Sequence, residues 1–297
     1  MGKALERVSS CEILRRHRRL TFRDGPYAYT ITREDDDSLY EVTDGQETFT
    51  ARLQWAFGQG GAGQTYVFEK NGNWYESRVS FFNDAQGLGL TLGATSAKPS
   101  SLEQAAGRLM SPVDARDCFD CHSTGAVHAH KLDVEDAIRG VQCENCHGPA
   151  AAHIQAIRAG NANAAKLVDL ARLSTEEMSD FCGRCHRTWA QIASQGLRGV
   201  IDVRFQPYRL TNSRCYDAAD KRIRCTACHD PHRPLVLDVS SYDSKCQACH
   251  DSTAKVCRVG RRNCAQCHMP KVALPGAHYQ FTDHEIRIVR PGAPYPD

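Results

Sequence analysis

The alternation of apolar and polar positions changes along the chain. Between residues 20 and 92, β-branched and aromatic residues alternate with polar ones in short runs, the period of strands with one buried face. These runs are Tyr27–Thr32, Leu39–Val42, Thr48–Leu53, Thr65–Lys70 and Trp74–Phe82. Asn71-Gly72 and Asp44-Gly45 each separate two neighbouring runs, and both dipeptides favour tight hairpins. We therefore predict a small antiparallel β domain.

Helical patterns lie on both sides of this region. Residues 2–18 carry apolar side chains at loose helical spacing, which predicts a short leading helix. Capping-box sequences at Ser100-x-x-Glu103 and Ser174-x-x-Glu177 predict two helix starts. Residues 150–159 predict a further helix, and strands are hardly indicated beyond residue 110.

The fold class that these patterns predict is α+β, in two domains. The first is β-rich, covers residues 1–95 and includes the short leading helix. The second covers residues 96–297 and is mainly helix and loop, with little regular secondary structure. A chain of 297 residues is long enough for two such domains.

One motif, Cys-x-x-Cys-His, recurs six times, and His directly follows every Cys-x-x-Cys pair. The copies are Cys118–His122, Cys143–His147, Cys182–His186, Cys225–His229, Cys246–His250 and Cys264–His268. Positions i, i+3 and i+4 share one face of a helical turn, so two thiols and one imidazole lie together. The thiols can add to the two vinyl groups of a haem while the imidazole ligates its iron.

The motifs therefore predict six covalently attached haems c. The expected thioether residues are Cys118, Cys121, Cys143, Cys146, Cys182, Cys185, Cys225, Cys228, Cys246, Cys249, Cys264 and Cys267. The expected proximal iron ligands are His122, His147, His186, His229, His250 and His268. Paired Cys-x-x-Cys motifs also build zinc sites, but zinc gives no reason for a His after every pair. A redox dithiol needs only one such motif.

A second set of histidines matches the haems in number. Outside the motifs, six histidines follow residue 110: His128, His130, His153, His232, His278 and His284. They are the expected distal ligands, and two imidazoles on each iron favour low-potential electron carriage over substrate chemistry. Methionine ligation would raise the potential, and the chain has only four Met. The seventh such residue, His17, is remote from the motifs and is expected at the surface.

The net charge of the chain bears on the partners that the protein can bind. The formal charge of +2 does not indicate nucleic acid or an anionic membrane as a partner. Each ferric bis-His haem with ionised propionates adds about −1, so six bring the molecule to about −4. The basic run at residues 15–19 is interpreted as a solvated helix face or, alternatively, as a docking patch.

The expected location is the periplasm or the outside of the cell. No stretch approaches 18 apolar residues, so no transmembrane segment is expected. The first twenty residues are charged and show no signal segment, but covalent haem attachment normally occurs outside the cytoplasm. Cys11, Cys215 and Cys257 lie outside the motifs, and in an oxidising compartment a Cys215–Cys257 disulfide is the favoured pairing.

Residues 110–290 resemble the multihaem cytochromes c related to the tetrahaem cytochrome c-554 and the pentahaem nitrite reductases. The resemblance rests on CENCHGP before His153, CTACHDPH ending at His232, and CAQCHMPK before His278 and Thr282-Asp283-His284. It implies that these four histidines ligate neighbouring haems from the distal side; His128 and His130 rest on the count alone. Ammonia-forming nitrite reductases bind their catalytic haem through Cys-x-x-Cys-Lys, whereas all six motifs here end in His.

Three functions remain open at this level. The first is an electron carrier in which six haems pass single electrons between redox proteins or extracellular acceptors. The second is a haem oxidoreductase in which one open distal site reduces a small nitrogen or sulfur oxyanion. The third is a subunit that self-associates into an oligomer or an extracellular conductive filament. No catalytic residue is predicted.

Overall fold

The computed structural model describes residues 1–94, 98–161, 163–250, 257, 259–290 and 292–296. The chain forms two compact units, which are considered one at a time. Unit 1 comprises residues 1–168 with the segment 275–279, and unit 2 comprises residues 169–274 with 280–297. The boundary predicted between residues 95 and 96 separates a haem-free domain from a domain that carries all six haem motifs. This division rests on where the haems are attached and not on how the chain packs, so it stays a prediction.

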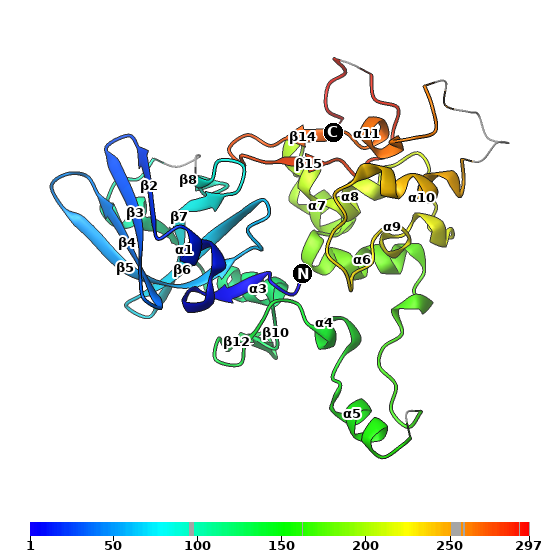
Figure 1. The fold of residues 1–297 in the computed structure, drawn as a ribbon, viewed down its shortest axis with the longest axis horizontal. Helices are drawn as coiled ribbons and strands as arrows, with labels where there is room; N and C mark the ends of the chain where they lie inside the picture. Colours follow the sequence, from blue (N-terminus) through cyan, green and yellow to red (C-terminus); the bar gives the residue numbers. More distant parts are fainter. Residues whose placement is uncertain (95–97, 162, 251–256, 258, 291, 297) are drawn as a thin grey trace. The chain divides into compact units, whose positions relative to one another are not determined.

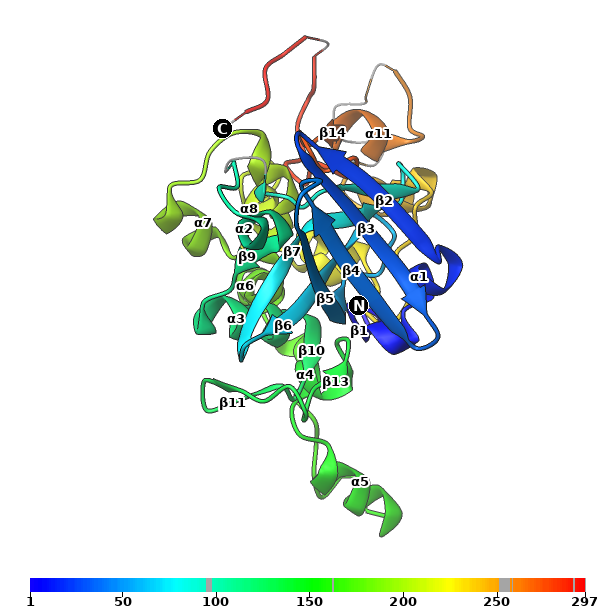
Figure 2. The ribbon, with the colours of Figure 1, turned by 90° about the vertical axis from the view of Figure 1, so that its left-hand side faces the viewer.

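Unit 1 is built around one antiparallel sheet whose strands lie side by side in chain order (Figures 1 and 2). The path is β2 (Arg19–Asp24), β3 (Tyr27–Glu34), β4 (Asp37–Thr43), β5 (Thr48–Phe57), β6 (Gly63–Lys70), β7 (Asn73–Phe82) and β8 (Gly87–Leu90). Two short strands extend it: β1 (Leu5–Arg7) pairs with β5, and β9 (Gly107–Leu109) pairs with β7. Since β8 also lies beside β2, the sheet nearly closes on itself.

The predicted α+β class is confirmed, as are all five predicted strands and both hairpins. Alternate residues of β3 and β4 are buried inside the curved sheet, among them Tyr29, Ile31, Tyr40 and Val42. This alternation follows from the two-residue period of the strands. The sheet interior therefore holds an aromatic and aliphatic core of its own.

Three local predictions need correction. The apolar residues of positions 2–18 are buried but fall in separate elements, because β1 takes residues 5–7, η1 spans Val8–Ser10, and helix α1 is confined to Glu12–Arg16. The basic run partly belongs to β2, where Leu20 points inward and the neighbouring arginines outward. The N-cap of α2 (Leu102–Ala106) is Ser101 and not the predicted Ser100. The Ser101 side chain accepts a hydrogen bond from the Gln104 amide.

The rest of unit 1 carries the first two haem motifs. Helix α3 (Pro112–His122) is followed by two small β-hairpins. Two helices, α4 (Cys143–His147) and α5 (Ala151–Arg158), come after them. The hairpins pair β10 (Ser123–Thr124) with β13 (Ile138–Arg139), and β11 (Val127–His128) with β12 (Lys131–Leu132). Helix α5 confirms the helix predicted over residues 150–159.

Unit 2 consists of short helices, loops and one hairpin (Figure 1). Its α-helices are α6 (Thr175–His186), α7 (Trp189–Gln195), α8 (Gln206–Thr211), α9 (Cys225–Cys228), α10 (Asp243–Gln247) and α11 (Cys264–His268). Its 3₁₀ turns are η3 (Leu170–Arg172), η4 (Val200–Arg204), η5 (Lys221–Ile223) and η6 (Val239–Tyr242), and the hairpin pairs β14 (Lys271–Ala273) with β15 (Gln280–Thr282). The capping box predicted at Ser174 and Glu177 forms as expected.

Candidate haem-binding sites

All six motifs fall on helical turns. Four occupy a helix to its last residue, as in α3 and α6, while His229 caps α9 and the fifth motif runs just past α10. A helical turn places residues i, i+3 and i+4 on one face. Each motif can therefore offer two thiols to the edge of a porphyrin and one imidazole to the iron of the same haem.

Five of the twelve expected ligand histidines each make the same kind of hydrogen bond through Nδ1. The Nδ1 atom lies 2.9 to 3.0 Å from a backbone carbonyl oxygen, to which it can donate only as N–H. The pairs are His122 with Ala4, His147 with Val168, His153 with Ala165, His268 with Arg287 and His284 with Thr282. This bond fixes the tautomer and leaves Nε2 with its lone pair, the arrangement that a metal-ligating imidazole needs.

Two expected ligands of unit 2 lie close together. The ring centroids of His229 and His284 are 6.2 Å apart, with the ring planes inclined by 42°. Burial lowers the pKa of His284 to about 4 and also lowers the pKa of His229, with a smaller effect of the nearby His186 on each. Both imidazoles are therefore neutral near pH 7, as iron ligation requires.

Cysteines of successive motifs meet in unit 2. A hydrogen bond from Cys182, in the third motif, lowers the pKa of Cys225 in the fourth. Burial raises the pKa of Cys264 in the sixth motif to about 11, with a contribution from its hydrogen bond to Cys246 in the fifth. Burial raises the pKa of Cys246 too, and the charge of Cys228 adds to the effect. The fourth motif therefore lies close to both the third and the fifth.

The first motif is packed onto the sheet of unit 1. Phe119, between its two cysteines, is fully buried in edge-to-face contact with Trp55 and Phe57, whose ring centroids lie 5.3 and 5.1 Å away. Phe57 also contacts the His122 ring at 5.3 Å. Gly107 allows this side of the sheet to close, because a Cβ atom there would lie 2.4 Å from the Glu76 carbonyl oxygen. The β sheet thus anchors the first motif.

Two features of unit 2 fit a haem. The Nε atom of Arg204 is buried without a hydrogen-bond partner, and within the described chain no carboxylate pairs with this guanidinium. Burial and the charge of Arg187, next to His186, lower the pKa of Arg204. An ionised haem propionate would supply a charged partner for this guanidinium. Leu235 and Leu237 are 64% and 76% exposed near the fourth motif, so apolar surface is available to a porphyrin.

The other four expected distal ligands, His128, His130, His232 and His278, are exposed. His128 is exposed on β11, with Nε2 3.6 Å from Asp136, and His130 lies exposed in the following turn. His232 is exposed beside Asp230. His278 belongs to the segment that packs on unit 1, where its ring lies 4.9 Å from that of Phe82. Their roles remain predictions.

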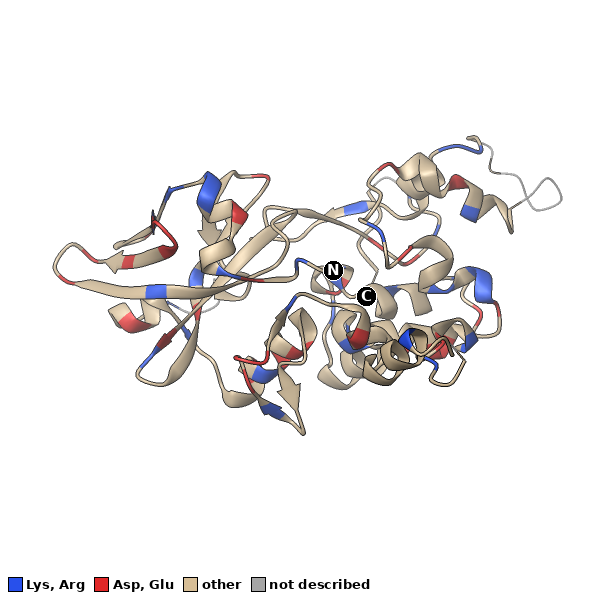
Figure 3. Cartoon of the chain, turned by 60° about the horizontal axis from the view of Figure 1, so that its bottom comes forward, with Lys and Arg blue, Asp and Glu red and all other residues tan. Residues whose placement is uncertain are grey.

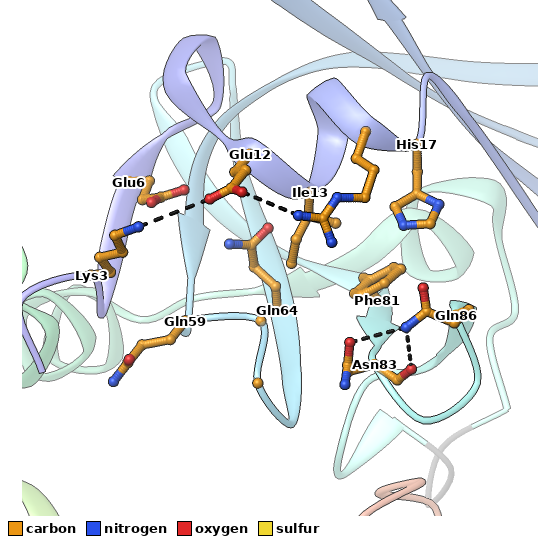
Figure 4. Close-up of a pocket in the computed structure, with 13 residues that line it drawn as sticks. Lys3, Glu6, Glu12, Ile13, His17, Gln59, Gln64, Phe81, Asn83 and Gln86 are labelled. Carbon is orange, nitrogen blue, oxygen red and sulfur yellow. Dashed lines mark hydrogen bonds and ion pairs between the residues drawn. The ribbon is translucent and has the colours of Figure 1, made fainter. Parts of the chain in front are cut away.

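His17 lines a cavity of unit 1 of about 230 Å³ and packs against Phe81 at 5.1 Å (Figure 4). Lys3 and Glu6 lie across the cavity from His17, and Glu12 lies on α1, the helix that ends at His17. Acidic and basic residues are interspersed over each unit (Figure 3). The cavity carries no haem motif.

The predicted Cys215–Cys257 disulfide is not formed, and both thiols are exposed. Cys11 is buried and donates from Sγ to Gln64 Oε1 over 2.9 Å. In the described residues, no group of three or more His, Cys, Asp or Glu side chains is placed to share a metal ion, whereas a haem iron takes only two ligands from protein. No helix of the described residues is long and apolar enough to cross a membrane.

Comparison with known proteins gives two matches. Residues 91–148 match the family described as cytochrome c554 and c-prime, a range that holds the first two motifs. The multiheme cytochrome MtrA of Shewanella baltica (strain OS185) is 23% identical over 194 residues, which cover 59% of this chain and 50% of the relative. The chain thus spans about half the length of that curated relative, and no solved structure matches it significantly. Together with the recurring Cys-x-x-Cys-His motif, these matches identify the chain as a multihaem c-type cytochrome.

Proposed function

We propose that the chain carries single electrons along six covalently attached haems c, each held by two histidines, between redox partners outside the cytoplasm. The observation that carries this proposal is that cysteines of successive motifs in unit 2 are hydrogen-bonded, Cys182 to Cys225 and Cys246 to Cys264. A thioether bond ties each cysteine to the edge of its own porphyrin. Cysteines that touch therefore bring the edges of neighbouring haems close together, which favours rapid electron transfer.

The residues of the chain supply attachment, ligation and rigidity. When bound, a haem supplies an iron that alternates between Fe(III) and Fe(II) without a change of ligands. The cysteines fix its position, and the neutral imidazoles offer Nε2 to the iron. Backbone carbonyls hold the Nδ1 side of five imidazoles, so these rings need not reorient when the iron charge changes.

His229 and His284 are the proposed ligand pair of the haem at Cys225 and Cys228. Each ring would offer its Nε2 to the iron, and the 6.2 Å between the ring centroids leaves the two imidazoles close enough to share one iron. The exposed histidines of the chain are proposed to complete other distal positions.

Native mass spectrometry and electron paramagnetic resonance of the oxidised holoprotein test the proposal together. We expect six haems per chain and low-spin ferric signals that account for all the iron. Fewer haems would contradict the count. A high-spin ferric signal with rapid turnover of nitrite or hydroxylamine would overturn the carrier function in favour of an oxidoreductase. Discrete particles in electron microscopy would argue against a filament.

A further inference from the structure

We propose that Arg209, through Asp283, is a positioning residue that holds two haem ligands, His284 and His268, on one rigid frame. The inference rests on the proposed function, since it takes both histidines as iron ligands. Arg209 lies on α8, and Asp283 directly precedes His284 after β15. None of the roles predicted from sequence includes either residue.

The pair is wholly enclosed. Arg209 and Asp283 side chains are both 0% exposed, and the guanidinium meets the carboxylate through two hydrogen bonds, from Nε at 2.9 Å and from Nη2 at 3.1 Å. Nη2 also lies 2.6 Å from Glu285 Oε2, and Nη1 donates to the Pro296 carbonyl over 3.1 Å. This two-pronged geometry is specific to arginine.

Stability alone does not call for this pair. Taking two full charges out of water costs more than burying apolar residues of similar volume, and such pairs are often replaceable without loss of stability. What a fully paired buried network does supply is a defined conformation of the backbone to which it is bonded. The relevant backbone here is that of residues 282–287.

The network fixes the chain on both sides of His284. The Asp283 amide donates to the Pro270 carbonyl over 2.9 Å, and the Glu285 amide donates to Asp283 Oδ1 over 3.0 Å. Ser213, close to α8 in sequence, donates from Oγ to the His284 carbonyl over 3.2 Å. With the backbone fixed, His284 Nδ1 reaches the Thr282 carbonyl and Nε2 stays available to iron.

The same carboxylate reaches the second histidine through Arg287. Arg287 Nη1 is hydrogen-bonded to Asp283 and donates to the Glu285 carbonyl over 3.0 Å. The Arg287 backbone then holds His268 from two sides: its carbonyl accepts from His268 Nδ1 over 2.9 Å, and its amide donates to the His268 carbonyl over 3.2 Å. Disturbing Asp283 should therefore affect the haem at His229 and the haem of the sixth motif together.

The test compares the oxidised holoproteins of Arg209→Met and Asp283→Asn with the unaltered chain. Asp283→Asn keeps the size of the side chain and removes its charge, so it remains informative if Arg209→Met does not accumulate. We expect a high-spin ferric fraction of up to about two haems in six, which added imidazole converts back to low spin. Arg209→Lys should recover only part of the native spectrum, because a lysine ammonium cannot make the two parallel hydrogen bonds of the guanidinium to Asp283.

Arg33→Met is the matched control. Arg33 is also buried, 5% exposed, and donates to the carbonyls of Val8, Ser9 and Asp35 in unit 1, none of which is bonded to an expected ligand. We expect it to lower the melting temperature and leave the haem spectra unchanged. Native spectra and potentials in Arg209→Met and Asp283→Asn would overturn the positioning role. If the unaltered chain itself lacks low-spin bis-His haems, the proposed function fails before the variants are compared.

Discussion

The rings of His229 and His284 lie close together in unit 2, with centroids 6.2 Å apart, although 55 positions separate the two residues in the chain. One belongs to a haem motif and the other follows the last strand. Because the burial of both rings keeps them neutral near pH 7, the pair suits an iron that takes two imidazoles.

Replacing His284 with Ala should therefore open one distal site. We expect about one sixth of the ferric iron to become high-spin or to bind added imidazole, measured by electron paramagnetic resonance and visible absorption. His17→Ala is the control, since His17 lies against Phe81 away from the motifs. A fully low-spin spectrum in the His284 variant would contradict the proposed pairing.

Arg204→Leu should lower the reduction potential of one haem. If Arg204 pairs with a haem propionate, removing this buried positive charge favours the ferric form, whose net charge is more positive by one. The shift should be on the order of tens of millivolts, since about 59 mV corresponds to a tenfold change in a one-electron equilibrium. Spectroelectrochemical titration measures it, with Arg52→Leu in unit 1, an exposed residue paired with Asp37, as control. A potential raised in the Arg204 variant would refute the assignment.

Phe119→Ala should destabilise unit 1. The ring is fully buried among Trp55, Phe57 and Trp74, and truncating such a ring costs about 3–5 kcal/mol. Chemical denaturation followed by tryptophan fluorescence measures the loss. Val113→Ala on the same helix is the control, because Val113 is 54% exposed and should change the free energy of unfolding by less than about 0.5 kcal/mol. Equal effects of the two changes would show that the first motif is not anchored by its phenylalanine.

Thiol reactivity should separate the cysteines into two classes. In the holoprotein only Cys11, Cys215 and Cys257 are outside the motifs, so alkylation should stop at three. Backbone hydrogen bonds from Val259 and Gly260 lower the pKa of Cys257, while burial raises that of Cys11. The thiolate of Cys257 therefore forms at lower pH and should react first, with Cys11 last. Mass spectrometry of a timed iodoacetamide reaction checks this order; a fourth labelled cysteine would mean a missing thioether bond.

Much of the fold was predictable because it follows local rules. The two-residue alternation in Tyr27–Thr32 and the later runs can bury one face only as strands, and Asn71-Gly72 adopts the positive φ angles that a tight hairpin needs. The leading segment was mispredicted because Leu5, Val8, Cys11 and Leu14 fit a helical period, yet tertiary pairing with β5 draws Leu5 into a strand. The helical spacing correctly indicated that these four residues are buried, but not which secondary structure each of them adopts.

The sequence by itself determined the chemistry of this protein: six repeats of two thiols and an imidazole, each confined to one turn of helix. Only the tertiary structure decided which motifs are neighbours, which histidines lie close together, and that a buried Arg209–Asp283 pair frames two of them. The physical reason is the separation along the chain over which each feature is set. Attachment depends on residues three and four positions apart, whereas ligand pairing joins residues such as His229 and His284, and no local pattern encodes a contact over that separation.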